Sequence, residues 1–366
     1  MEIVRKFKGI DLFAFTCCST IALGVSFLPY VGGDEVRSAW LKVMVAVLPY
    51  FLFFFLLKKF SDKYDSYDLF FELKGSIWKW VYGLIVFYFI CSTILSITYG
   101  LEALTLLTQV YLLPNTDKWM VLLLFMLVSG IGLSYGITAI TRFAVALIFV
   151  EFILLFSVIS LGFSEYFRWI YIPPVWTTDI WTFLESSISD MARYSGVIAV
   201  LSFLPYLKKE SSVFRPMSYG LLLVTSIYVS ICIVVVGTFG FEQTITLISP
   251  FTALVQSLST RTGVVERLDL FFLGVWLIAY YKIMLIQAWF LLFLLQRLFP
   301  LKRPKIYLPL SITCLFIIAL LIPSFVELIW IPIFANQLVY SFVVPTTLLL
   351  FLIMKRKKGV NQSEAS

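Results

Sequence analysis

Long apolar runs alternate with short polar or charged segments along the whole chain. The apolar core of a bilayer is about 30 Å thick, so a helix that crosses it needs about 20 mostly apolar residues. By this criterion the pattern predicts ten membrane-spanning helices. They are Ile10–Tyr30, Trp40–Leu57, Trp80–Leu107, Trp119–Tyr135, Thr138–Phe163, Ile188–Leu207, Met217–Phe241, Leu268–Leu295, Ile306–Val326 and Ile329–Met354. The expected fold class is an all-α membrane protein.

The segments between these spans are too short to fold as separate domains. The longest loops are expected at Lys58–Lys79, Ser164–Ser187 and Glu242–Arg267. Helical spacing predicts one short helix within Asp68–Trp80 on the inner surface and another at Pro250–Ser259 on the outer side. We therefore expect a single integral membrane domain over residues 1–366, in which residues 355–366 form a polar, disordered tail.

Composition supports lipid as the solvent of this chain. Hydrophobic residues make up 61% of the sequence and charged residues 13%. Soluble domains carry about 25% charged residues, so this chain has too little polar surface to cover a body of its size in water.

Residue usage also excludes several kinds of chemistry. The chain has no histidine, the commonest general base and metal ligand. Its cysteines are odd in number, form no C-x-x-C pair and all fall in apolar runs, which argues against a disulfide framework and a zinc site. They are Cys17, Cys18, Cys91, Cys232 and Cys314. We expect no metal, no cofactor and no catalytic residue, and the chain is predicted not to be an enzyme.

Orientation follows from the distribution of lysine and arginine. With the N-terminus in the cytoplasm, twenty of the 28 basic residues fall in inner loops and tails and six in outer loops. This bias obeys the positive-inside rule, so both termini are predicted to be cytoplasmic. It also accounts for the net charge of +7 and leaves no basic stripe for nucleic acid.

A short internal repeat connects the two halves of the chain. Ser26-Phe27-Leu28-Pro29-Tyr30 recurs as Ser202-Phe203-Leu204-Pro205-Tyr206, in the first and sixth predicted spans. The first span runs outward and the sixth inward, which is the relation expected of an inverted repeat. We therefore predict a five-plus-five arrangement with halves at about 10–163 and 188–354.

Glycine and proline in the repeated spans predict that helices 1 and 6 are broken. A break frees backbone N–H and C=O groups, which lipid tolerates only where they line a cavity. Such groups can bind both charged ends of a small solute at the bilayer midplane, with spans 3 and 8 as the other walls; the alternative is that Gly and Pro only kink or pack the helices. The backbone candidates are Ala22, Leu23, Gly24, Val25, Ser26, Phe27, Ser195, Gly196, Val197 and Ala199, and the side-chain candidates are Tyr99, Tyr281 and Lys282.

Three ionisable residues are predicted to lie inside the membrane. Glu151 falls halfway along span 5 and Lys282 near the middle of span 8. Each isolated charge would cost at least about 2.5–3.5 kcal/mol there, so we expect the two side chains to approach each other or to share a polar cavity. In a functional role, the Lys282 ammonium would replace a coupling cation or act as a gate. The alternative is that the pair of Glu151 and Lys282 is only structural. Glu102 in span 3 lines the pathway or faces the outer water.

The start of span 8 carries a family resemblance. Pro250 opens the preceding short helix, Glu266-Arg267-Leu268-Asp269 stands at the start of the span, and Trp276 follows. Charges at a helix start are explained by the helix dipole alone. The run also resembles the Glu-Arg-x-Asp signature of the spore germination permease family, the B subunits of germinant receptors. The resemblance extends over nearly the whole chain, although the segments at Gly24 and Gly196 depart from the usual pattern.

The resemblance implies a fold and a function. The family looks like a branch of the amino acid–polyamine–organocation transporter superfamily, whose members have five-plus-five inverted repeats. A member is expected to sense a nutrient such as an L-amino acid in the inner membrane of a bacterial spore, together with an A subunit and a lipoprotein C subunit. The alternatives are a proton- or cation-coupled amino acid permease, and a structural membrane partner with a vestigial pocket.

Overall fold

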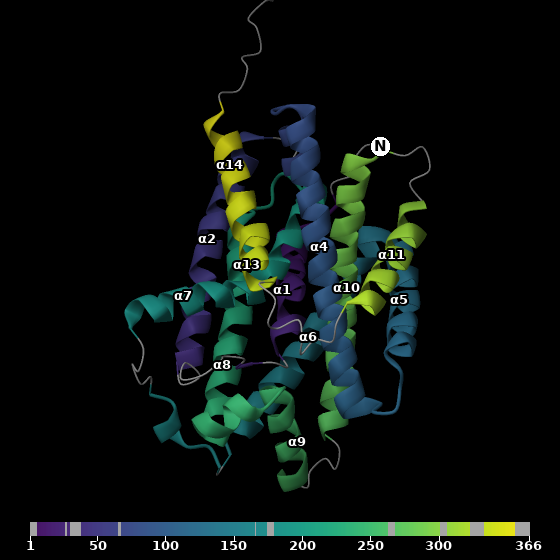
Figure 1. Ribbon diagram of the computed structural model, residues 1–366. Coiled ribbons are helices and arrows are strands. Elements are labelled where there is room, and N and C mark those ends of the chain that lie inside the picture. Colours follow the sequence, from purple (N-terminus) through teal and green to yellow (C-terminus); the bar gives the residue numbers. More distant parts are fainter. Residues whose placement is uncertain are drawn as a thin grey trace, which may run out of the picture.

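The computed structural model describes residues 6–25, 28–29, 38–64, 67–164, 166–173, 179–262, 268–300, 306–322 and 333–355. Its regular elements are helices, most of which run roughly parallel to one another in a bundle (Figure 1). The α-helices are α1 (Gly9–Val25), α2 (Ala39–Lys63), α3 (Leu69–Lys74), α4 (Lys79–Leu107), α5 (Lys118–Ser134), α6 (Gly136–Gly162), α7 (Ile180–Asp190), α8 (Phe214–Thr246), α9 (Pro250–Thr262), α10 (Leu268–Leu298), α11 (Tyr307–Leu321), α13 (Ile333–Leu338) and α14 (Val344–Met354).

Several helical segments depart from α geometry. The 3₁₀ segments are η3 (Trp169–Tyr171), η4 (Met191–Ser202) and η5 (Leu204–Tyr206), and the π-helical segments are η2 (Thr108–Leu112) and η7 (Val339–Val343). The 3₁₀ geometry of η4 is unusual because such helices rarely exceed three or four residues. At about 2.0 Å per residue, η4 and η5 together span about 30 Å, the thickness of a bilayer core.

Six helical stretches in the described part of the chain are long and apolar enough to cross a membrane. They are Ala39–Lys63, Lys79–Leu112, Gly136–Gly162, Phe214–Thr246, Asp269–Leu298 and Asn336–Met354. Shorter apolar helices occupy Gly9–Ile21, Lys118–Ser134 and Tyr307–Leu321. Large apolar side chains point outward from the bundle; Leu124 and Ile131 on α5 and Ile153 on α6 are each more than 60% exposed. Such an apolar exterior is suited to lipid rather than to water.

Six of the ten predicted spans overlap these long helices and three overlap the shorter ones, whereas three details of the prediction were wrong. Span 1 was expected to continue as far as Tyr30, whereas α1 ends at Val25. Residues 164–187 were expected to be a loop, yet they contain η3 and most of α7. Span 6 was expected to start at Ile188, but that residue belongs to α7, which lies across the other helices (Figure 1). Both predicted surface helices are present, as α3 and α9.

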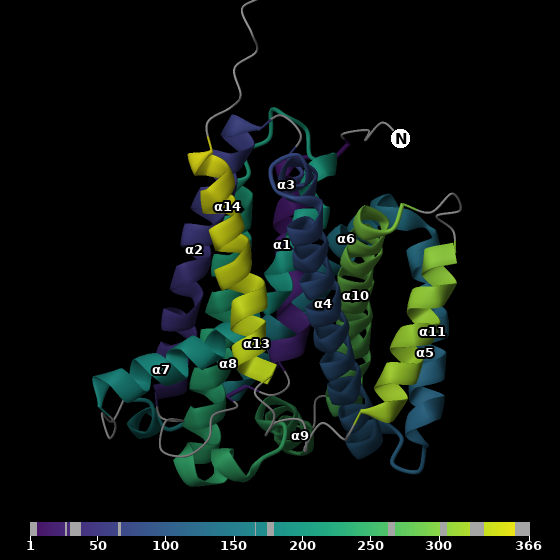
Figure 2. The same cartoon turned by 45° about the horizontal axis from the view of Figure 1, so that its top comes forward.

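The first helix lies at the centre of the bundle. α1 packs against α6, α8, α10 and η4, and its buried residues belong to the main hydrophobic core. Figure 2 shows α2, α8 and α14 on one side of it and α10, α5 and α11 on the other. Because α1 touches these four elements, a shift of α1 is transmitted directly to both sides of the molecule.

Candidate functional site

The polar run in α1 is satisfied mainly within its own helix. The hydroxyl of Thr16 donates to the Leu12 carbonyl at 2.8 Å, and the hydroxyl of Ser19 donates to the Thr16 carbonyl at 2.9 Å. Thr20 donates to the carbonyls of Thr16 and Cys17 at 3.1 and 3.0 Å. These bonds give each hydroxyl a partner inside the buried helix, so the hydroxyls need no ligand.

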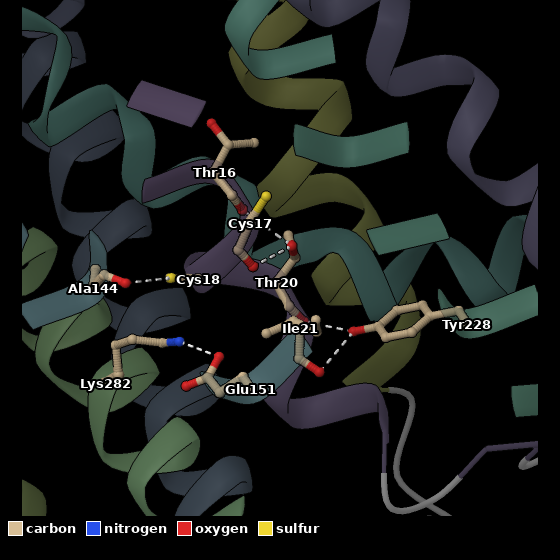
Figure 3. Close-up of polar contacts among 9 residues, drawn as sticks. All are labelled: Thr16, Cys17, Cys18, Thr20, Ile21, Ala144, Glu151, Tyr228 and Lys282. Atoms are coloured by element: carbon tan, nitrogen blue, oxygen red, sulfur yellow. Dashed lines mark hydrogen bonds and ion pairs between the residues drawn. The ribbon is translucent and has the colours of Figure 1, made fainter. Parts of the chain in front are cut away.

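The two cysteines of this run hold α1 close to its neighbours. The Cys17 thiol donates to the carbonyl of Gly220 in α8. The Cys18 thiol donates to the carbonyl of Ala144 in α6, as Figure 3 shows. Small residues allow such close approach between helices in lipid. This part of α1 therefore packs rather than lines a cavity.

Gly196 brings the backbones of η4 and α1 into contact. A Cβ atom at this position would lie 1.9 Å from the carbonyl oxygen of Ser19, so only glycine fits. Gln287 of α10 donates its amide to the Gly196 carbonyl at 3.2 Å. The first and sixth predicted spans therefore touch at Gly196, and the contact itself has no room for a solute.

Tyr228 of α8 supports the end of α1 from the other side. Its hydroxyl lies 2.6 Å from the Thr20 carbonyl and 3.2 Å from the Ile21 carbonyl (Figure 3). These two carbonyls lie before the last four residues of α1, which ends at Val25, so the hydroxyl adds a second hydrogen bond to groups inside the helix. Tyr228 is itself fully buried.

The remaining backbone candidates surround this contact. Ser195, Val197 and Ala199 of η4 are buried in the bundle. Val25 is the last residue of α1 and is 3% exposed. Ala22, Leu23 and Gly24 belong to α1, and Ser26 and Phe27 lie outside the described residues.

Glu151 and Lys282 form an ion pair in the interior. Glu151 Oε2 accepts a hydrogen bond from Lys282 Nζ, which joins α6 to α10 (Figure 3). The two residues are 3% and 0% exposed. The expected approach of these charges is confirmed, for the reason given above: either charge alone would be expensive to bury.

The second carboxylate oxygen of Glu151 takes no part in the ion pair with Lys282. Oε1 is buried and accepts no hydrogen bond from the described residues. Buried polar atoms are nearly always satisfied, and one water molecule is enough to satisfy this oxygen.

A small pocket lies beside this carboxylate. It is formed by the end of α1, the middle of α6 and the first half of α10, and its volume of about 20 Å³ leaves room for about one water molecule. It is lined by Ile21, Val25, Glu151, Leu154, Leu155, Phe272, Val275, Trp276 and Ala279. Glu151 is the only charged residue among them. The pocket unites three predicted residues that were singled out for separate reasons: Val25, Glu151 and Trp276.

The other side-chain candidates lie elsewhere. Tyr281 turns toward α5, where its hydroxyl donates to the Val128 carbonyl at 3.0 Å. Its ring packs edge-on against Phe125 and Phe143, at centroid distances of 6.1 and 5.7 Å. Tyr99 on α4 is half-buried and packs against the core. Neither residue lines the pocket beside Glu151.

Glu102 has a partner of its own. Its carboxylate lies 2.7 Å from the ammonium of Lys118, at the start of α5, and Glu102 is 3% exposed. Glu102 was expected either to line the pathway or to face the outer water. Its burial beside Lys118 disfavours the second alternative.

The signature residues are distributed over two helices. Pro250 begins α9, Asp269 lies in the first turn of α10, and Trp276 follows two turns later with its ring 5.3 Å from that of Tyr280. Glu266 and Arg267 lie outside the described residues.

A buried charge cluster was missed by the sequence reasoning. Lys42 falls near the start of the predicted span Trp40–Leu57 and was not singled out, but it lies in the first turn of α2 and is 2% exposed. Its charged neighbours are Asp190 and Arg193, which pair with each other at 3.2 Å. No linear pattern connects residue 42 with residues 190 and 193, so only the packing of α2 against α7 and η4 reveals the cluster.

Fold and site together define a multi-pass α-helical membrane protein with an ion pair and a small pocket in its interior. The chain belongs to the spore germination protein family, since the profile described as "Spore germination protein" matches residues 9–326.

Relatives of similar length support this assignment. Spore germination protein A2 of Bacillus subtilis (strain 168) is 25% identical over 291 residues, which cover 78% of each chain. Spore germination protein B2 of the same strain is 21% identical over 274 residues, or 74% of each chain. Spore germination protein YndE is 21% identical over 259 residues, covering 70% of this chain and 71% of the relative.

Proposed function

We propose that this chain is the nutrient-sensing membrane subunit of a spore germinant receptor. A small solute, an amino acid by preference, binds in the membrane interior and changes the arrangement of the helices. The observation that carries the proposal is the match of the spore germination protein profile to residues 9–326, in a chain whose interior contains the Glu151–Lys282 ion pair. A membrane interior with few polar groups is suited to the recognition of a small solute. The residues that line the cavity beside Glu151 offer no pair of nucleophile and base for catalysis.

The proposed architecture is a five-plus-five inverted repeat with interruptions in helices 1 and 6. Two features support it: α1 ends at Val25, well before the predicted end of its span, and η4 replaces an α-helix in the sixth. Solute that binds at the end of α1 would shift α1 against η4. Binding drives such a shift only by favouring one arrangement over the other.

The proposed setting is the inner membrane of a bacterial spore, with both termini in the cytoplasm and with A and C subunits as partners. The distribution of basic residues supports the orientation. The names of the relatives support the spore as the setting.

The first experiment is to delete the gene in its spore-forming host and to purify the tagged chain gently from spore membranes. The proposal predicts loss of germination in response to one nutrient class. It also predicts two co-purifying subunits, one with a large soluble domain and one a lipoprotein. Normal germination of the deletion strain, combined with solute uptake by the purified chain in liposomes, would replace the receptor by an amino acid permease.

A further inference from the structure

The helix α7 exposes two chemically different faces. Its residues turn by about 100° each, so every position has a known direction around the helix axis. Phe183 and Ser187 are buried against the bundle. The exposed apolar side chains fall together in one arc, the apolar arc, which consists of Ile180, Trp181, Leu184 and Ile188. The exposed polar side chains fall in the arc beside it, the polar arc, which consists of Thr182, Glu185 and Ser189. One face of α7 thus meets the protein, and the two arcs meet different surroundings.

The place of α7 along the bundle follows from the segment that comes after it. η4 begins directly after Asp190, and η4 and η5 together span about 30 Å. The far end of this segment is bonded to the start of the chain, because the Tyr206 carbonyl accepts hydrogen bonds from the N–H groups of Lys6 and Phe7. The side chain of Lys6 is exposed there, as expected of a lysine at a membrane surface. A bilayer core is about 30 Å thick, so α7 joins the bundle at the opposite boundary between lipid and water.

The direction of α7 matches such a boundary. Figure 1 shows α7 lying across the spanning helices, so its axis runs along the membrane surface. The border between the apolar arc and the polar arc follows the helix axis, and it is therefore parallel to that surface. α2, which packs against α7, exposes an apolar stripe of its own at Met44, Leu48, Leu52 and Phe55. Lipid is thus the neighbour expected of the adjoining helix and of the apolar arc alike.

The composition of α7 indicates the kind of lipid contact. Its charged residues are Glu185 and Asp190, and Ile180–Asp190 contains no lysine or arginine. Amphipathic helices bind membranes through buried apolar area and, where they are basic, through attraction to anionic headgroups. The second contribution is absent here, and tryptophan, as at Trp181, prefers the headgroup region. A protein partner would cover an irregular patch, whereas a straight border between two arcs fits a planar boundary.

We propose that α7 is an interfacial helix whose apolar arc lies in lipid and whose polar arc lies in water, on the membrane surface opposite to the N-terminus. Its partner is the boundary between headgroups and acyl chains, with no requirement for anionic lipid. The proposal is independent of nutrient sensing. Because η4 begins where α7 ends and touches α1 at Gly196, the lipid contact of α7 fixes one end of the segment that packs against α1.

Nitroxide labels on the two arcs test the proposal. The exposed native cysteines are first removed as Cys91→Ser and Cys314→Ser. Single labels are then attached in Leu184→Cys, Ile188→Cys, Glu185→Cys and Ser189→Cys, two on each arc. The full-length chain, with any subunits that co-purify, is placed in vesicles of phosphatidylcholine. Electron paramagnetic resonance then measures how often each label collides with oxygen, which concentrates in lipid, and with a water-soluble nickel chelate.

The ratio of oxygen to nickel collisions should be several-fold higher on the apolar arc than on the polar arc, and added phosphatidylglycerol should leave it unchanged. Two positions on each arc keep the comparison possible if one variant fails to fold. Equal ratios on both arcs would overturn the proposal, because α7 would then lie wholly in water or wholly in lipid. Labels on the apolar arc that are shielded from both reagents would overturn it too, since a protein partner would then cover that face. A high ratio that appears only with phosphatidylglycerol would replace it by attraction to anionic headgroups.

A charge placed on the apolar arc gives a second test with a matched control. Leu184→Glu puts a carboxylate into lipid, so α7 should move toward water and the label in Ile188→Cys should become accessible to the nickel chelate. Thr182→Glu adds the same carboxylate to the polar arc and should leave that label in lipid. The same nickel accessibility in both variants would contradict the proposal, because the position of α7 would then not depend on which arc carries the charge.

Discussion

Removing the Lys282 ammonium should destabilise the protein strongly. In Lys282→Met the side chain keeps its approximate length and apolar stem but leaves Glu151, 3% exposed, without its cation. Breaking a buried ion pair by removing one partner costs about 3–5 kcal/mol, because the remaining charge stays buried and uncompensated. Since whole domains are stable by about 5–15 kcal/mol, this is a large fraction of the total.

A second substitution, Glu151→Gln, removes the uncompensated carboxylate and tests the prediction more strictly. In the double variant Lys282→Met, Glu151→Gln, no charge remains, so stability should return to within about 1 kcal/mol of the native chain. The assay is reversible unfolding of the purified protein in mixed micelles, followed by tryptophan fluorescence. Lys74→Met, which removes an exposed lysine at the end of α3, serves as the control and should change stability by less than about 0.5 kcal/mol.

The reasoning would be refuted by a Lys282→Met protein as stable as the native chain. It would also be refuted by a double variant no more stable than the single one. Either result would mean that the carboxyl group left behind is compensated in another way, by water or by taking up a proton.

Three further substitutions test other contacts. Gly196→Ala should destabilise by at least about 1–3 kcal/mol, because its methyl group collides with the Ser19 carbonyl; a folded, fully stable variant would contradict the close contact of η4 with α1. Tyr228→Phe should cost about 0.5–1.5 kcal/mol by removing a buried hydrogen bond to the Thr20 carbonyl, measured by the same unfolding assay. Burial raises the pKa of Asp68, against the opposing effect of Arg297, so the negative charge contributes little by itself. Asp68→Asn, which can still cap α3, should therefore cost less than Asp68→Ala, and equal losses would contradict this.

The spans and the ion pair could be predicted because each has a strong local signal. A crossing helix requires a long apolar run, which any reading of the chain detects. Glu151 and Lys282 stand out because charges are rare in such runs, and their pairing follows from the energy of burying them apart. These conclusions need no knowledge of how the helices are arranged.

The features that were missed depend on packing. α7 is an 11-residue helix with polar residues on one face, so its apolar signal is weak beside those of the spans. Lys42 stands near the start of a predicted span, where a lysine can reach water, yet it is buried beside elements almost 150 positions further along the chain. The pocket combines Val25, Glu151 and Trp276, and nothing in the chain connects these positions before the fold brings them together.

The geometry of η4 has a mechanical consequence. Twelve residues of 3₁₀ helix extend over about 24 Å, whereas the same residues in an α-helix would extend over about 18 Å. The segment can thus change length by about 6 Å while it stays helical. Its far end is tied to the start of the chain, because the N–H groups of Lys6 and Phe7 donate to the Tyr206 carbonyl and that of Lys208 donates to the Phe7 carbonyl. A change of helix type in the sixth span would pull the segment that precedes α1, and so turn an event inside the membrane into a displacement at its surface.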